Sequence, residues 1–278
     1  MRIRFGFRLA LDCAQPTPAQ FLVDIHPSRR RDVLQEGALS VRPAAPLRTH
    51  TDAFGNVVRR LVLPAGRTVI EHDGIIRDSG RPDPVEPDAR QTPVADLPPD
   101  AMPFLLPSRY VESDLVGGEA WRLFGHVPEG WARVQAICDY VHQRISFGYH
   151  HADNTRTAWR SLSEGRGVCR DFAHLAIAMC RSMNIPARYC TGYLGDIGVP
   201  RDPAPMDFSA WFEAYLDGRW YSFDARHNVP RIGRVVIARG RDAADVAIVS
   251  TFGPHMLSHF EVWTDELAEA PEVAIAAE

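Results

Sequence analysis

Apolar and polar side chains alternate along the N-terminal part of the chain. Between residues 2 and 11, every second position carries a large apolar side chain: Ile3, Phe5, Phe7, Leu9 and Leu11. A period of two predicts a β-strand with one buried face and one face in water. Shorter apolar runs follow at 21–25, 57–63 and 68–70, with turn residues between them. This spacing predicts a β-rich N-terminal domain over residues 1–81.

Proline dominates the next segment. Eight prolines occur between Pro82 and Pro107, a stretch of 26 residues. Prolines at this density favour extended polyproline geometry over helix or strand. We therefore expect residues 82–107 to form a linker between two domains.

Beyond the linker, the apolar spacing becomes helical. Trp131, Val134, Ile137, Val141 and Ile145 recur every three to four residues, which predicts an amphipathic helix. A second helix is expected to begin near Cys169 and to end before Pro186. Strand-like runs then return at 187–194, 208–216, 220–226, 235–238 and 260–263. This order predicts an α+β domain over residues 108–278, with helices packed on an antiparallel sheet.

Composition removes several classes of function. All 31 basic residues are arginine, so the chain has no Walker-A lysine and no lysine that could form a Schiff base with pyridoxal phosphate. The net charge is −4 without a basic cluster, so we expect no nucleic-acid partner. No apolar run reaches the ~20 residues that span a bilayer. The N-terminus lacks the apolar segment of a signal peptide, so we expect a cytoplasmic protein without membrane contact.

The cysteine and histidine spacings predict neither a metal site nor a cofactor site. Five scattered cysteines form no disulfide framework and no CxxC motif. The sequence contains no HExxH motif, no EF-hand loop and no dinucleotide-binding glycine motif after a strand. We therefore expect a protein without a cofactor.

Cys169 is the first candidate for chemistry, because it follows two glycines and opens a predicted helix. The segment reads Gly165-Arg166-Gly167-Val168-Cys169-Arg170-Asp171. The free N–H groups at a helix N-terminus can lower the pKa of a thiol and can hold an oxyanion. The alternative interpretation is that Cys169 is a small buried core residue, which is the usual place of a free cysteine.

A predicted hairpin supplies further candidates. Asp217-Gly218 is a two-residue turn signal that would pair Leu216 with Arg219. The same register places Trp211 opposite Asp224 and Ser209 opposite Arg226. Ser209 and Asp224 then become diagonal neighbours on one face of the hairpin, where a site could lie.

These segments together resemble the bacterial transglutaminase-like superfamily. The resemblance lies in Gly167-Val168-Cys169-Arg170-Asp171-Phe172-Ala173, Ser209-Ala210-Trp211-Phe212-Glu213 and Trp220-Tyr221-Ser222-Phe223-Asp224. It implies a papain-like α+β core, with Cys169 as nucleophile and Asp224 as the residue that orients a histidine. The β-rich N-terminal segment is similar to the accessory domain that precedes this core in bacterial members.

The sequence departs from the family at the histidine. The family pattern His-Ala-Trp reads Ser209-Ala210-Trp211 here, and serine cannot act as a base near neutral pH. Three explanations stay open. Another histidine serves as base, the thiolate is supported by the helix terminus and a cation alone, or the site is inactive.

His227 is the nearest substitute base. Strand parity places it on the apolar face of the hairpin, so it could reach the site only if the strand ends or bulges after Arg226. Arg226 itself could stabilise a thiolate, or it could form a salt bridge with Glu213 or Asp224. We expect Trp211 and Arg226 to be substrate-binding residues.

The resemblance implies a thiol acyl-transfer enzyme whose substrate is a peptide or protein amide. Cys169 would attack the amide carbonyl, and water would most often resolve the resulting thioester, as in a cysteine peptidase or amidase. The main alternative is a catalytically inactive binding or scaffold protein that keeps the fold. A third alternative, an arylamine-acetyltransferase-like enzyme, lacks a coenzyme A signature.

Overall fold

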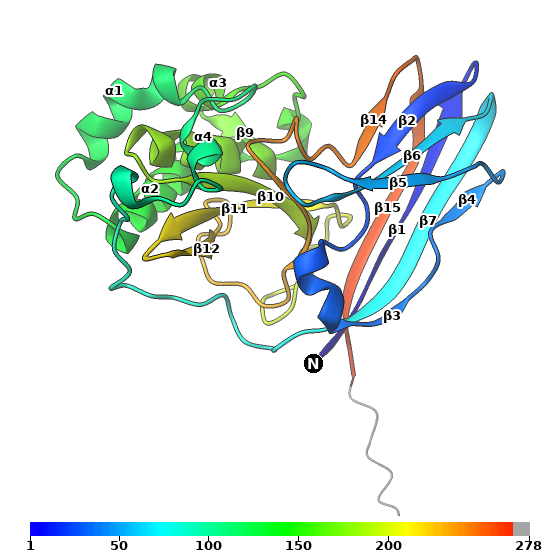
Figure 1. Ribbon diagram of the computed structural model, residues 1–278, viewed down its shortest axis with the longest axis horizontal. Coiled ribbons are helices and arrows are strands. Elements are labelled where there is room, and N and C mark those ends of the chain that lie inside the picture. Colours follow the sequence, from blue (N-terminus) through cyan, green and yellow to red (C-terminus); the bar gives the residue numbers. More distant parts are fainter. Residues whose placement is uncertain (269–278) are drawn as a thin grey trace, which may run out of the picture.

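Two β-sheets stacked face to face form the lobe that contains the N-terminus (Figure 1). The computed structural model describes residues 1–268. One sheet has the strand order β15-β1-β7-β3, with β4 also paired to β7, and the other has the order β14-β2-β6-β5. The strands of this lobe are β1 (Arg2–Cys13), β2 (Thr17–Phe21), β3 (Val33–Glu36), β4 (Ser40–Arg42), β5 (Arg48–Thr51), β6 (Val57–Leu63), β7 (Gly66–Arg77), β14 (Val249–Thr251) and β15 (Met256–Leu267).

The alternation at the N-terminus forms the strand that it predicts. In β1, the side chains of Ile3, Phe5, Phe7, Leu9 and Leu11 are at most 1% exposed. The arginines between them, Arg4 and Arg8, stay exposed on the other face. A strand buried on one face in this way contributes to stability mainly through the apolar area that it removes from water.

The second lobe consists of helices packed on an antiparallel sheet of order β12-β11-β10-β13 (Figure 1). Its helices are α1 (Ser113–Phe124), α2 (Trp131–Arg144), α3 (Ala158–Glu164) and α4 (Cys169–Ser182). Its sheet strands are β10 (Ala187–Tyr193), β11 (Ser209–Leu216), β12 (Arg219–Phe223) and β13 (Val235–Gly240). Two short strands, β8 (Ser146–Phe147) and β9 (Arg166–Gly167), form a separate parallel pair. The predicted α+β architecture after a β-rich N-terminal region is confirmed.

The last two strands of the described chain return to the first lobe. β15 pairs with β1 along its length, with Phe7 opposite Val262, and β14 pairs with β2, with Val249 opposite Phe21. The expected division assigned this part of the sequence to the core of residues 108–278, and it placed a last strand only near residues 260–263. That assignment is wrong for β14 and β15. An apolar pattern predicts a strand, but it does not say which distant strand covers its edge.

The proline-rich segment follows the surface of the second lobe. Asp83 accepts a hydrogen bond from Arg234 Nε at 2.8 Å, and the carbonyl of Leu106 accepts one from Arg181 Nη1 at 2.8 Å. Within the segment lie the short 3₁₀ turns Val94–Asp96 and Met102–Leu105. Buried apolar side chains from both lobes belong to one continuous cluster, so residues 82–107 run between regions that share a core.

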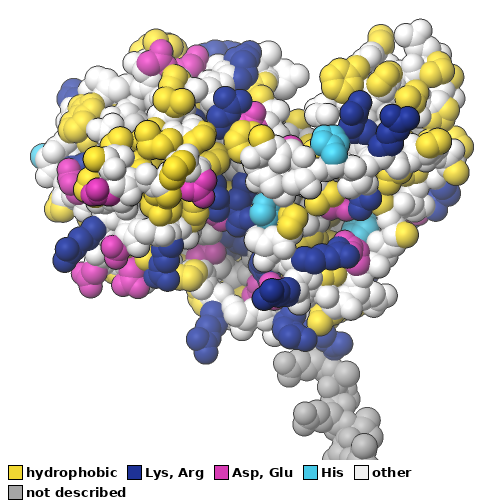
Figure 2. Space-filling view, viewed as in Figure 1, with side chains coloured by type: hydrophobic (Ala, Val, Ile, Leu, Met, Phe, Trp, Pro, Cys, Tyr) yellow, Lys and Arg dark blue, Asp and Glu magenta, His cyan; other side chains and the backbone are white. Residues whose placement is uncertain are grey.

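The two lobes meet along most of their height, and a notch separates them at the top of the view in Figure 2.

Within residues 1–268, none of the helices is long and apolar enough to cross a membrane.

We expect Gly6→Ala to destabilise the first lobe. A Cβ at Gly6 would lie 2.4 Å from the His72 carbonyl oxygen and 2.4 Å from the Trp263 ring, so β7 or β15 would have to shift. Overpacking of this kind costs about 1–3 kcal/mol of unfolding free energy. Denaturant unfolding measures the change.

Gly118→Ala is the matched control. Gly118 lies inside α1, and a Cβ there meets nothing within 4 Å. Because alanine is the better helix former, this variant should gain about 0.5–1 kcal/mol of unfolding free energy. Equal losses in both variants would contradict the close packing of β1 between its two neighbours.

Candidate active site

The loop before α4 depends on two glycines that place Cys169 at the first position of the helix. Gly165 ends α3 in the left-handed conformation, with φ of 65°. Gly167 lies so close to Asp171 that an added Cβ would approach its Oδ2 to 2.6 Å. The chain can therefore pass from α3 to α4 within a few residues, and the N–H groups of the first turn of α4 have no partner four residues earlier.

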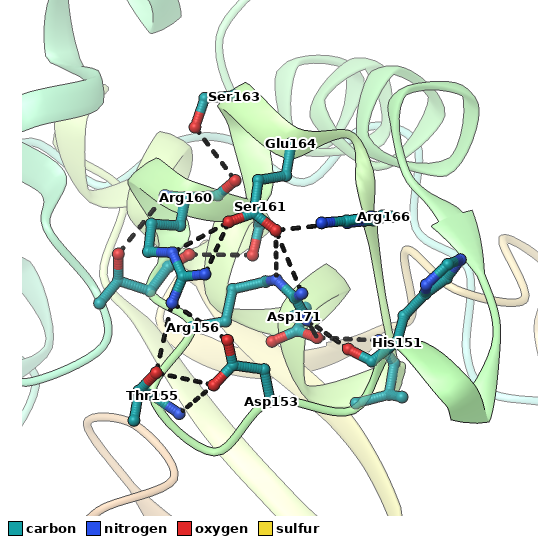
Figure 3. Close-up of polar contacts among 12 residues, drawn as sticks. His151, Asp153, Thr155, Arg156, Arg160, Ser161, Ser163, Glu164, Arg166 and Asp171 are labelled. Carbon is teal, nitrogen blue, oxygen red and sulfur yellow. Dashed lines mark hydrogen bonds and ion pairs between the residues drawn. The ribbon is translucent and has the colours of Figure 1, made fainter.

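A buried ion network fixes this loop (Figure 3). The Asp171 carboxylate accepts a hydrogen bond from the N–H of Val168 at 2.8 Å and forms an ion pair with Arg156 at 3.3 Å. Arg156 also pairs with Glu164 at 3.1 Å and donates to the His151 carbonyl at 2.5 Å. The side chains of Arg156 and Asp171 are 4% and 0% exposed. The start of α4 is thus held by an ion pair that is almost completely buried.

Burial dominates the ionisation of Asp171. It raises the pKa of this carboxyl above its usual value, although the Val168 N–H and the charges of Arg170 and Arg156 act in the opposite direction. The carboxylate therefore depends on these partners to stay charged.

The thiol of Cys169 is the most accessible of the five cysteines. Cys169 is partly buried, whereas Cys13, Cys138, Cys180 and Cys190 are buried. Desolvation raises the pKa of the Cys169 thiol to about 11. The Arg226 charge and the nearby Ala210 N–H lower this pKa, and Asp207 and Asp224 raise it. Desolvation thus outweighs the groups that favour the thiolate, and the pKa of the thiol stays above its usual value.

Asp224 lies directly after the end of β12 and is held by several donors. Its Oδ2 accepts from His227 Nδ1 at 2.9 Å and from Arg234 Nη2 at 3.0 Å. Its Oδ1 accepts from the backbone N–H groups of Arg226 and His227, each at 3.0 Å. Burial alone would raise the pKa of this carboxyl, but the Arg234 charge and the His227 hydrogen bonds lower it well below the usual range. The group is therefore an ionised carboxylate.

The hairpin register is as predicted, but β12 is shorter than expected. Leu216 pairs with Arg219 and Phe212 with Phe223, and the paired register ends there. The expected pairs of Trp211 with Asp224 and of Ser209 with Arg226 do not form. Strand parity beyond Phe223 therefore gave the wrong direction for His227.

A turn capped by Asp224 explains the change. Residues 225–227 turn back, and Asp224 Oδ1 accepts the two N–H groups of that turn. A short acidic side chain that binds the N–H groups two and three residues later favours a turn over a continued strand. This turn brings the His227 side chain back to Asp224. Strand parity allowed this only if the strand ended or bulged after Arg226, and the strand ends earlier, at Phe223.

The other expected site residues, Ser209 and Trp211, do not line the same cavity. Ser209 opens β11 and lines the same cavity as Cys169. Trp211 is 2% exposed, packs with Cys190 and Val236, and lies beneath the Arg234 guanidinium at 5.1 Å from the ring centre. It does not line either of the described cavities that contain Cys169.

Arg226 lines the same cavity as Cys169 and does not pair across the hairpin. Its guanidinium lies 3.8 Å from the ring centre of Phe147, and the residue lines the cavity at Cys169. Glu213, one of its two expected salt-bridge partners, instead binds Arg188 and Arg239 at 2.5 and 2.9 Å. The interpretation of Arg226 as a group that stabilises a thiolate agrees with this position.

Two cavities include Cys169 in their walls. The first, here called the polar cavity, has a volume of about 610 Å³ and is also lined by Ser209, Arg226 and His227. The second, here called the apolar cavity, has a volume of about 1270 Å³ and extends between the lobes along Leu9 and Leu11 of β1.

Four residues line both cavities: Cys169, Asp207, Phe208 and Phe260. No signal in the sequence marked Asp207 or Phe260 as a site residue. Asp207 lies in a segment without regular pattern, and Phe260 belongs to β15, whose partner strand is distant in the sequence. Among residues 1–268, no group of three or more His, Cys, Asp or Glu side chains is arranged to hold a metal ion.

We expect Arg156→Met to destabilise the protein strongly. Removing the guanidinium takes one of two cations from the buried Asp171, which keeps only Arg170 at 3.4 Å, and takes one arginine from Glu164. Loss of a partner in a buried network typically costs about 3–5 kcal/mol. Arg160→Met is the control, because Arg160 pairs with the same Glu164 but is 42% exposed, and it should change stability much less. Urea unfolding compares the two variants, and similar small losses would show that the network does not support α4.

The pH dependence of alkylation tests the state of the Cys169 thiol. Since only the thiolate reacts with iodoacetamide, and burial sets the pKa at about 11, the rate should rise about tenfold per pH unit from pH 7 to 10 without levelling. Mass mapping should find Cys169 labelled before the four buried cysteines.

Arg226→Gln should slow this alkylation at a fixed pH, because it removes a charge that lowers the thiol pKa. Arg201→Gln is the control, since Arg201 lines the same cavity and is exposed. A rate that levels below pH 8 in the wild type would show that the thiolate is already paired with a cation.

The candidate site coincides with the part of the chain that matches a known family. The model of the transglutaminase-like superfamily matches residues 122–225, a range that includes Cys169, Ser209 and Asp224 and ends before His227. A Mycobacterium leprae relative, the uncharacterized protein ML0607, is 37% identical over 94 residues, which are 31% of this chain and 32% of that protein. The chain thus spans about a third of the length of this curated relative.

One solved structure matches nearly the whole chain. It is the crystal structure of a protein from Cytophaga hutchinsonii that is provisionally described as a cysteine protease. The two chains are 32% identical, the TM-score is 0.83, and the match covers 97% of this chain and 92% of the other. From this match and the family model together, it follows that the chain belongs to the transglutaminase-like superfamily.

Proposed function

We propose that the protein is a cysteine hydrolase that cleaves a peptide or amide bond through a thioester on Cys169. One observation carries the proposal: His227 is bonded to the Asp224 carboxylate, and its ring lines the same cavity as Cys169. A nucleophile, a base and a group that orients the base are the parts that acyl transfer to a thiol requires. Here the base comes from a position 18 residues beyond Ser209.

The hydrogen bond between His227 and Asp224 defines the role of each ring nitrogen. Nδ1 carries the proton that it donates to Asp224 Oδ2, so Nε2 keeps a lone pair. In the first step, Nε2 takes the Cys169 proton and the sulfur attacks the amide carbonyl carbon. The negative charge moves to the carbonyl oxygen, where free N–H groups of the first turn of α4 can hold it.

Collapse of this intermediate breaks the carbon–nitrogen bond. His227 returns its proton to the leaving amine, and the acyl group remains on Cys169 as a thioester. A water molecule then loses a proton to His227 and attacks the thioester carbonyl. The carbon–sulfur bond breaks, a carboxylic acid leaves, and the thiol takes back the proton, so that atoms and charge balance over the cycle.

The high pKa of the thiol makes the base necessary. With a pKa of about 11, only about one thiol in 10⁴ is ionised at pH 7. Arg226 lowers this pKa but cannot accept a proton. Deprotonation during the attack therefore needs His227 to approach the sulfur.

A catalytically inactive binding protein is the second candidate, and three features favour it. Position 209 carries serine instead of the family histidine, and the thiol is mainly un-ionised. Within residues 1–268, the imidazole of His227 bonds to Asp224 and no hydrogen bond joins it to Cys169. In this alternative the cavities bind a peptide without cleaving it.

His227→Ala separates the two candidates. We expect it to lower amide hydrolysis by ~10²–10⁴, the usual contribution of a general acid–base group, with peptide anilides as substrates and anilide release as readout. Acylation by an activated thioester should fall less, because its leaving group needs no proton. His126→Ala is the control, since His126 is exposed and lines neither cavity at Cys169.

Cys169→Ala should abolish hydrolysis and the acyl-enzyme mass, while Ser209→His should add little to a wild type that already uses His227. If the wild type is inactive on broad anilide and ester panels, and Ser209→His creates activity, the family histidine is the missing part and His227 is no base. If both proteins are inactive, the binding-protein alternative replaces the hydrolase.

A further inference from the structure

We propose that the two cavities divide the substrate at Cys169, and that the β-rich lobe determines specificity. The apolar cavity takes an apolar side chain on the acyl side of the scissile bond. The polar cavity takes a cationic group on the amine side. The inference rests on the proposed function only for the kind of bond that is cleaved. The two cavities and their lining residues come from the structure itself.

The wall of the apolar cavity favours an apolar group. Most of its lining side chains are aliphatic or aromatic, and β1, residues 246–249 and β15 supply many of them. Asp153, Arg170 and Asp207 also line it. Two large apolar side chains of this wall are exposed: Leu257 is 48% exposed and Phe260 is 40% exposed. Exposed apolar side chains around a concave surface are typical of ligand sites, because a bound apolar group removes them from water.

The polar cavity has an excess of negative charge. Five carboxylates line it, from Asp196, Asp202, Asp207, Glu261 and Asp265, against three guanidinium groups.

Two of those three cations are engaged by the protein. Arg231 is 3% exposed, binds the Gly195 carbonyl at 2.9 Å and forms an ion pair with Asp196 at 3.6 Å, and Arg226 lies over Phe147. Within residues 1–268, Asp202, Glu261 and Asp265 form no ion pair with an arginine, so a cationic ligand group in this cavity meets an excess of negative charge. Opposite charges favour binding and select against anions.

The position of His227 decides which part of the substrate enters which cavity. His227 lines the polar cavity and not the apolar one. The leaving amine must receive its proton from this imidazole in the proposed cycle, so the amine side lies in the polar cavity. The acyl side then extends past Cys169 into the apolar cavity.

The β-rich lobe contributes the selecting residues on both sides. Leu257 and Phe260 of β15 border the apolar cavity, and Glu261 and Asp265 of the same strand border the polar cavity. Because β15 belongs to the sheet of β1, the lobe that contains the N-terminus supplies one wall of the site. This arrangement gives the lobe a role in substrate choice in addition to its packing.

The experiment uses four peptides that differ only at the two residues beside the scissile bond. Phenylalanine or glutamate stands on the acyl side, and lysine or glutamate stands on the amine side. Binding is measured with fluorescent peptides and full-length Cys169→Ala, and cleavage is measured with the wild type. We expect the peptide with phenylalanine and lysine to bind and react at least tenfold better than the peptide with two glutamates.

Two variants test the walls, each with a neighbouring control in β15. Leu257→Glu should reduce the preference for phenylalanine about tenfold and leave the preference for lysine. Met256→Glu is its control, because Met256 is 61% exposed and lines neither cavity at Cys169. Asp265→Asn should reduce the preference for lysine about threefold, whereas Glu266→Gln, which changes an exposed neighbour outside the cavity, should not.

The outcomes distinguish the two proposals. Cleavage of all four peptides at similar rates would overturn the division of the substrate and leave the hydrolase in place. Selective binding without any cleavage would support the division and overturn the hydrolase. Failure of all four peptides to bind Cys169→Ala would overturn the assignment of both cavities.

Discussion

The buried carboxylate of Asp224 holds together the parts of the chain that make the site. It accepts from Arg234 at 3.0 Å, and Arg234 in turn binds Asp83 of the proline-rich segment at 2.8 Å. The same carboxylate caps the turn after β12 and orients His227. Replacing this buried carboxylate would be costly, because all of its donors would lose their shared acceptor. The end of the hairpin, the start of β13 and the approach from the linker are therefore fixed relative to one another by one group.

Local signals in the sequence predicted much of this geometry. Asp217-Gly218 gave the correct register of the hairpin, because a two-residue turn leaves only one way to pair the strands. The glycines before Cys169 gave the start of α4, because a close approach and a left-handed residue leave few other conformations. Where a short segment determines the backbone, the sequence was sufficient.

The features that the sequence did not predict depend on contacts between residues that are far apart in the chain. The end of β12 depends on whether Asp224 binds its own turn or continues a strand, and its buried partner Arg234 lies ten residues later. The partner strands of β14 and β15 lie more than 200 residues earlier in the sequence. Because these pairings could not be predicted, the wall that β15 contributes to the apolar cavity was not predicted either. Trp211 followed the predicted parity, but the face that it shares with Glu213 lies against Arg234 and Arg239 rather than at Cys169.

The chemistry of position 209 follows from the same carboxylate. Asp224 Oδ2 already accepts from His227 and Arg234, and Oδ1 accepts two backbone N–H groups. A second imidazole from position 209 would need a free lone pair on this carboxylate, but each oxygen already accepts two hydrogen bonds. The two histidines therefore exclude each other as partners of Asp224. Serine at 209 is small enough to leave the polar cavity open beside Cys169. In the proposed enzyme, the base thus approaches Asp224 from the turn after β12 instead of from the start of β11, while the nucleophile and the carboxylate keep their places.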